Sequence, residues 1–133
     1  MAPPAGSRAS RLAVHGRVGE RAAAAWLEAR GYRVLARNVR SRFGEIDLVA
    51  RQAGLVVFVE VKARIGQGFG HPSEAVVARK QRRLARLAAR FLQANGLGSC
   101  PVRFDAVAVL LGPRGQVVAI EHIPDAFQVE GAP

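Results

Sequence analysis

The segment FGEIDLVARQAGLVVFVEVKAR, residues 43–64, decides the fold of this chain. It is rich in β-branched and aromatic residues and is interrupted by a Gln-Ala-Gly turn, so it predicts two strands, over 43–51 and 55–64. The stretch before it, residues 32–40, has the same character and is separated from Phe43 by only two polar residues. The sequence therefore predicts three consecutive strands that form a meander.

Two helical segments flank this meander. Residues 16–30 (GRVGERAAAAWLEAR) are dense in helix formers, and Gly31 is predicted to end that helix. The second helix is predicted over 77–95 and is followed by strands over 102–111 and 116–122. The expected order is α-β-β-β-α-β-β, which defines an α/β fold with a mixed sheet flanked by helices.

The length of 133 residues fits one domain. We expect a flexible basic N-terminal arm over 1–14, a single domain over 15–124 and a C-terminal tail over 125–133. No stretch offers the ~20 consecutive apolar residues of a membrane span. The N-terminus has Pro, Ser and Arg where a signal peptide has an apolar run, and the single Cys100 excludes an intramolecular disulfide. These features predict a cytoplasmic protein.

The charge balance indicates the kind of partner. Twenty Lys and Arg against ten Asp and Glu give a net charge of +10 and a pI of about 11.6. Polyanions are the expected partners, nucleic acid before an acidic membrane surface, because Arg and Lys neutralise backbone phosphates. The candidate contacts lie along the second helix: Arg79, Lys80, Arg82, Arg83, Arg86 and Arg90.

This basic helix has two faces. Its arginines form one stripe, and Leu84, Leu87, Ala88 and Phe91 form the opposite one, so the apolar stripe is expected to pack on the sheet. A charged outer face is often simply solvated, but five like charges without interleaved acids favour a polyanion partner. Lys80 and Gln81 fall toward the packed side near the start of the helix.

Charged residues also interrupt the apolar strands. Alternation puts Glu60 and Lys62 on one face of their strand, and Glu45 and Asp47 on a common face of the preceding strand. An unpaired buried ion costs several kcal/mol, so these positions need compensation. A divalent cation would compensate several carboxylates at once. The alternative is a structural ion pair between Glu60 and Lys62, with Asp47 paired to one of the many arginines. The conjunction of these acids with the upstream Glu20 and the basic helix favours the metal site.

Five strings taken in order resemble a known family: Gly16-x-x-Gly19-Glu20, GEIDLVA (44–50), VEVKAR (59–64), FGHPSEAV (69–76) and RKQRRL (79–84). Together they are similar to the YraN family of endonuclease-like proteins, within the PD-(D/E)XK nuclease superfamily, which includes Holliday-junction resolvases. The resemblance extends over residues 14–124. It implies a restriction-endonuclease-like core and a site with Mg²⁺ or Mn²⁺.

The resemblance also assigns roles. It makes Asp47 and Glu60 metal ligands, with the Val61 carbonyl as a further ligand, and Lys62 the residue that positions the nucleophile. Glu20 matches an acid that some members bring to the metal from the first helix.

Two positions complete the match. Gln81 matches a polar residue on the helix after the Lys strand, whereas Ile46 stands where the superfamily name has Pro. The implied activity is hydrolysis of phosphodiester bonds in DNA, including branched or structured DNA. The expected partner is nucleic acid and not a membrane, and a homodimer is allowed. The alternative is a non-catalytic nucleic-acid-binding or scaffold protein with a nuclease fold.

Overall fold

The computed structural model describes residues 8–66 and 78–128. Five strands form one sheet in the order β1-β2-β3-β4-β5, in which β3 and β4 are parallel and the other neighbours are antiparallel. The elements are α1 (Arg8–Ala29), β1 (Arg33–Ser41), β2 (Gly44–Gln52), β3 (Leu55–Ile65), α2 (Ala78–Ala94), β4 (Val102–Leu111) and β5 (Val117–Ile123). The predicted α/β order and mixed sheet are confirmed.

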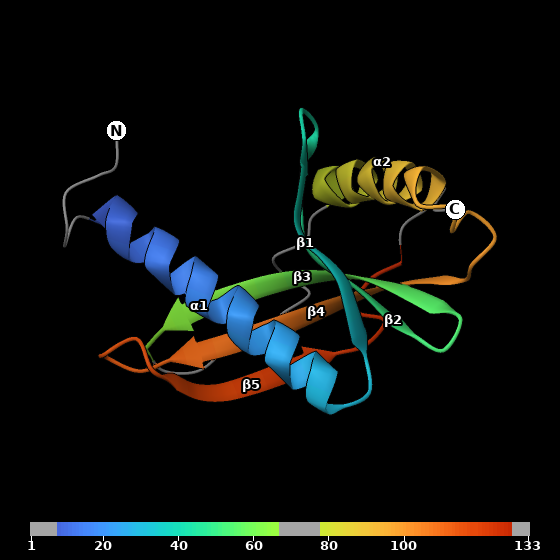
Figure 1. The fold of residues 1–133 in the computed structure, drawn as a ribbon. Helices are drawn as coiled ribbons and strands as arrows, with labels where there is room; N and C mark the ends of the chain where they lie inside the picture. The colour runs from blue at the N-terminus through green and yellow to red at the C-terminus, as the bar shows by residue number, and fades with distance from the viewer. Residues whose placement is uncertain (1–7, 67–77, 129–133) are drawn as a thin grey trace.

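The sheet separates two apolar clusters, one under each helix. Alternation along β3 sends Val57 and Val59 to the cluster that contains Leu27 of α1, and sends Val56 and Phe58 to the cluster on α2. Helix α1 crosses one face of the sheet, and α2 lies beside the turn between β1 and β2 (Figure 1). The two parallel strands, β3 and β4, contribute residues to both clusters, so both of their faces are covered, as is usual for parallel strands.

Two boundaries differ by more than one residue from those expected. Helix α1 begins at Arg8 and so takes in half of the segment predicted as an arm, because Ala, Leu and Arg there are good helix formers. At the other end, residues 125–128 are not a free tail. The Ala126 amide donates to the Phe104 carbonyl at 2.9 Å, and Phe127 is buried in the α2 cluster. The apolar core therefore extends at least as far as Phe127.

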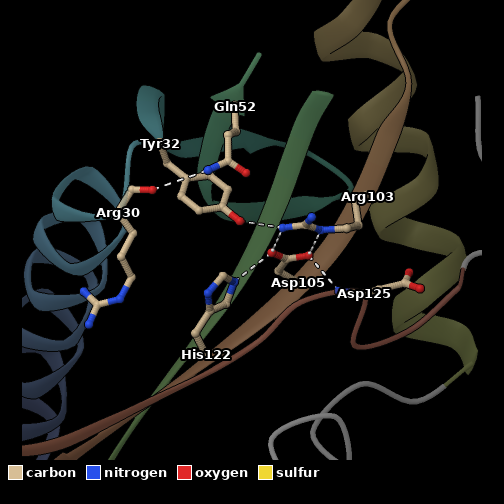
Figure 2. A network of polar contacts seen from close by, with 7 residues as sticks. All are labelled: Arg30, Tyr32, Gln52, Arg103, Asp105, His122 and Asp125. Carbon is tan, nitrogen blue, oxygen red and sulfur yellow. Dashed lines mark hydrogen bonds and ion pairs between the residues drawn. The ribbon is translucent and has the colours of Figure 1, made fainter. Parts of the chain in front are cut away.

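Asp105 is fully buried in β4, and its carboxylate is held by hydrogen bonds from three neighbours (Figure 2). Arg103 donates to both carboxylate oxygens at 2.7 and 2.8 Å, the Asp125 amide donates at 2.9 Å, and His122 Nε2 lies 2.8 Å away. Burial alone would raise the pKa of Asp105, but the hydrogen bonds from Arg103 and His122 outweigh it and lower that pKa. Arg103 also donates to the Tyr32 hydroxyl, so this acid is structural and ties together β4, β5 and the start of β1.

No helix in the described part of the chain is long and apolar enough to cross a bilayer.

Helix α1 packs closely against β3 at Gly19. A Cβ atom at this position would lie 2.7 Å from the Cβ of Ala63, which is closer than side-chain carbons approach. Gly19 is therefore needed for the separation of α1 from β3, and the next residue along the helix is Glu20. The seating of α1 fixes where that acid lies.

Gly19→Ala is expected to lower the free energy of unfolding by about 1–3 kcal/mol, because overpacking outweighs the better helix propensity of alanine. Adding Ala63→Gly should return part of that loss, which a double-mutant cycle in urea will measure. Gly16→Ala is the matched control: a Cβ there meets nothing within 4 Å, so it should stabilise the protein by up to about 1 kcal/mol. Equal effects of the two Gly→Ala changes would contradict the close contact.

Candidate functional site: a carboxylate cluster where two strands diverge

Strands β2 and β3 separate in the middle of the sheet. Their pairing ends at Leu48 opposite Val59, while β2 continues alongside β1 as far as Gly44. Beyond that point the Val61 amide donates to a carboxylate oxygen of Asp47 at 2.7 Å in place of a backbone carbonyl. The Asp47 side chain thus fills the fork between the strands and is held there by the backbone.

Helix α1 and the start of β2 bring two further acids to this fork. Oxygen atoms of Glu20, Glu45 and Asp47 all lie within 4.8 Å of one another, and we call these three residues the carboxylate cluster. A side-chain hydrogen bond from Asn38 holds Glu20. Glu45 is about one third exposed (35%) and has Arg40 Nε 3.5 Å from one of its oxygens.

The electrostatics of the cluster are unfavourable without a cation. Burial raises the pKa of Asp47 to about 7, with a further contribution from the Glu60 charge and smaller ones from the other two acids, against the opposing Val61 hydrogen bond. Burial also raises the pKa of Glu20 above its ordinary value, and the charge of Glu45 adds to it. Within the described residues no Lys, Arg or His pairs with Asp47.

Glu60 lies on the face of β3 opposite the apolar cluster that contains Leu27 of α1. It continues the face of Val56 and Phe58, its side chain is only 10% exposed, and it forms an ion pair with Lys80 of α2. Glu60 is near enough to raise the pKa of Asp47, but the described acids within mutual ligand distance are the three of the carboxylate cluster. Lys80, predicted on the packed side near the start of α2, is half-buried against this acid.

The remaining predicted residues lie around the fork. Lys62 is exposed one step along the Glu60 face, and no ion pair joins it to another described residue, so the alternative of a Glu60–Lys62 pair is wrong. Val61 contributes its amide to Asp47, and Gln81 is partly buried at the start of α2. The string at 69–76 and the side chain of Arg79 lie outside the described residues.

Sequence reasoning missed Glu45 as a site residue. The signal was present, because alternation already placed Glu45 and Asp47 on one face. What could not be read was that β2 leaves β3 at this point, so that α1 can reach both acids.

Two open pockets flank the turn between β1 and β2. One, of about 330 Å³, is lined by Gly16, Arg17, Glu20, Asn38, Arg40 and Glu45, so two of the three acids of the carboxylate cluster face it. The other, of about 520 Å³, is lined by Arg42, Phe43, Gly44, Arg82, Arg83 and Arg86, and we call it the arginine pocket. The predicted outward arginine stripe is confirmed at Arg82, Arg83, Arg86 and Arg90, which are exposed.

These features define a small α/β protein with an acidic site at diverging strands and a basic surface beside it. Residues 19–109 match the family described as "Uncharacterised protein family UPF0102", so the chain belongs to that family, in agreement with the resemblance to the YraN family. It is 57% identical to a UPF0102 protein of Symbiobacterium thermophilum over 77% of this chain and 86% of the relative. It is 50% identical to one of Moorella thermoacetica over 84% and 93%, and 48% identical to one of Rhodococcus jostii over 82% and 92%.

Proposed function

We propose that this protein is a metal-dependent nuclease that hydrolyses phosphodiester bonds in DNA. The observation that carries the proposal is Asp47: a partly buried carboxylate in a cluster of acids, with a raised pKa and no cationic partner among the described residues. A fold keeps such a group only where something compensates it, and a divalent cation does so most directly.

The donor set fits Mg²⁺ or Mn²⁺. Both ions prefer carboxylate oxygens and keep open positions for water and phosphate. Asp47, Glu20 and Glu45 would hold the ion, and Glu60 is the acid whose pairing with Lys80 would have to change for it to join them, as the family resemblance implies. A bound cation of this kind supplies Lewis-acid activation of the phosphate and of the attacking water.

The residues around the cluster suit an anionic substrate. Arg17 and Arg40 line the same pocket as Glu20 and Glu45, so a phosphodiester that enters it meets positive charge beside two of the proposed metal ligands. Lys62 is exposed and free of ion pairs within the described part of the chain, which leaves its ammonium group available to orient the attacking water or to stabilise charge on the phosphate.

The test is incubation of the purified protein with duplex, single-stranded and branched DNA, and with RNA, each in Mn²⁺, Mg²⁺ or EDTA. We expect metal-dependent cleavage of DNA that is lost in Lys62→Ala. Cleavage that persists unchanged in Lys62→Ala would come from a contaminant or from another site. Binding without cleavage under every condition would instead establish the non-catalytic nucleic-acid-binding protein.

Binding itself tests the basic helix. Glutamine substitution of Arg79, Arg82, Arg83, Arg86 and Arg90 should flatten the slope of log K against log salt by about 0.9 for each phosphate of duplex DNA that the variant no longer neutralises. The reduction in affinity should be similar for unrelated duplex sequences, because arginines bound to phosphate do not read bases. Arg114→Gln is the matched control, since Arg114 is an exposed arginine on the β4–β5 turn. An unchanged slope in the five-fold variant would show that the stripe only faces solvent.

A further inference from the structure

The arginine pocket combines positive charge with an aromatic ring. Four arginines line it, Arg42 from the β1–β2 turn and Arg82, Arg83 and Arg86 from α2, and none of the four forms an ion pair with a described residue. Unpaired guanidinium groups that converge on one concave site are suited to phosphate. The volume of about 520 Å³ lies in the range of sites that hold a small molecule or a single nucleotide.

Phe43 supplies the aromatic surface. Phe43 lines the pocket and also packs against the α2 cluster, which keeps it in place. The guanidinium carbons of Arg42 and Arg90 lie 4.9 and 5.8 Å from the ring centroid. The Phe43 amide donates to Ser41 Oγ at 3.0 Å, which fixes the turn. A half-buried phenyl ring among arginines is a surface on which a base can stack.

The pocket is built in advance of any ligand. Gly44 has φ +137°, a conformation that favours glycine, and a Cβ atom there would lie 3.2 Å from Cδ of Arg83. The turn and α2 therefore meet closely at this point, as their proximity in Figure 1 indicates. Gly44 also precedes Glu45 of the carboxylate cluster, so the pocket lies one residue along the chain from the acids.

We propose that the arginine pocket binds one unpaired nucleotide of a single-stranded DNA segment, with its phosphate on the arginines and its base on Phe43. This inference rests on the proposed DNA substrate and names the part of it that the protein selects. Bases inside a duplex are stacked on one another and are not available to Phe43, whereas the phosphates of either form are open to the arginines. The preferred substrate is therefore DNA with an unpaired stretch beside the bond that is cut.

The test is equilibrium binding in EDTA, measured by fluorescence anisotropy, so that no cleavage is needed. The probes are a short oligothymidylate and an abasic chain of the same length, which carries the same phosphates without bases. We expect wild type to bind the oligothymidylate about tenfold more tightly, the effect of one stacked base. Phe43→Leu should lose that preference and Phe43→Tyr should keep it.

The arginines provide the matched comparison. Arg83→Gln and Arg86→Gln should weaken binding of both probes by the same factor, because both probes have the same phosphates. Equal affinity of wild type for the two probes would overturn the inference even if Phe43→Leu failed to fold, and so would a Phe43→Leu variant that keeps the full preference. Absence of cleavage in Mn²⁺ would overturn the proposed nuclease and leave this preference measurable.

Discussion

Asp47→Ala, Glu60→Ala and Lys62→Ala are each expected to reduce Mn²⁺-dependent DNA cleavage by about 10²- to 10³-fold, the effect of removing one preorganised electrostatic group from an active site. Asp47 is the acid at the fork, and its loss removes one of the three acids of the carboxylate cluster. Lys62 has no structural partner among the described residues, so its loss should leave the melting temperature unchanged. Single-turnover cleavage with saturating DNA is the measurement.

Glu60→Ala needs a second variant because it leaves Lys80 without its acid. Glu60→Gln keeps an oxygen acceptor for Lys80 and removes only the negative charge, so equal reductions in the two variants would assign the effect to that charge. Glu121→Gln, an exposed acid on β5, is the matched control and should cleave at the wild-type rate. Wild-type rates in Asp47→Ala would remove the carboxylate cluster from the mechanism.

Asp47→Asn is expected to raise the stability of the metal-free protein at high pH. The pKa of Asp47 is about 7 in the folded protein and about 4 in the unfolded chain. Between about pH 4 and pH 7 the folded state therefore keeps a proton on Asp47 that the unfolded state has released. Wild-type stability should therefore fall as the pH rises from about 4 to about 7, by at most about 4 kcal/mol. Asparagine still accepts the Val61 hydrogen bond but carries no charge, and so avoids this fall.

Thermal unfolding in EDTA across this pH range measures the difference. The two proteins should be equally stable near pH 4, and Asp47→Asn should melt higher at pH 8. Mn²⁺ at 100 times its Kd should stabilise wild type by about 2.7 kcal/mol at that pH and have a smaller effect on Asp47→Asn. If Asp47→Asn instead melts lower at every pH and Mn²⁺ shifts neither protein, Asp47 is a structural acid.

The strands were predictable because their two-residue alternation and the short turns between them are local signals. Glu60 and Lys62 fall on one face of β3 as alternation requires, and the apolar stripe with Leu84 and Leu87 lies on the sheet. The ion-pair partner of Glu60 could not be predicted from local sequence. That Glu60 pairs with Lys80 rather than Lys62 depends on where α2 crosses the sheet, which no spacing in the sequence reports.

The parts of the site differ in the same way. Glu20 was predicted from its motif, but the closeness of Glu20 to Glu45 depends on the Gly19 contact and on the divergence of β2 from β3. The arginine stripe was read from helical periodicity, whereas Phe43 of the arginine pocket looked like an ordinary strand residue. Local sequence patterns could not predict the contacts between helices and strands.

The parallel pairing of β3 and β4 also has a consequence for synthesis of the chain. Val56 of β3 pairs with Val102 of β4, so β4 emerges from the ribosome well after α1, β1, β2 and β3. Closing such a long loop is entropically costly, and this pairing should therefore form late. Until then β3, with its run of buried valines, has an open edge on the nascent chain. All the acids of the candidate site are thus synthesised before β4, the strand that pairs with β3. The chain should be most prone to aggregate in the interval before β4 is synthesised.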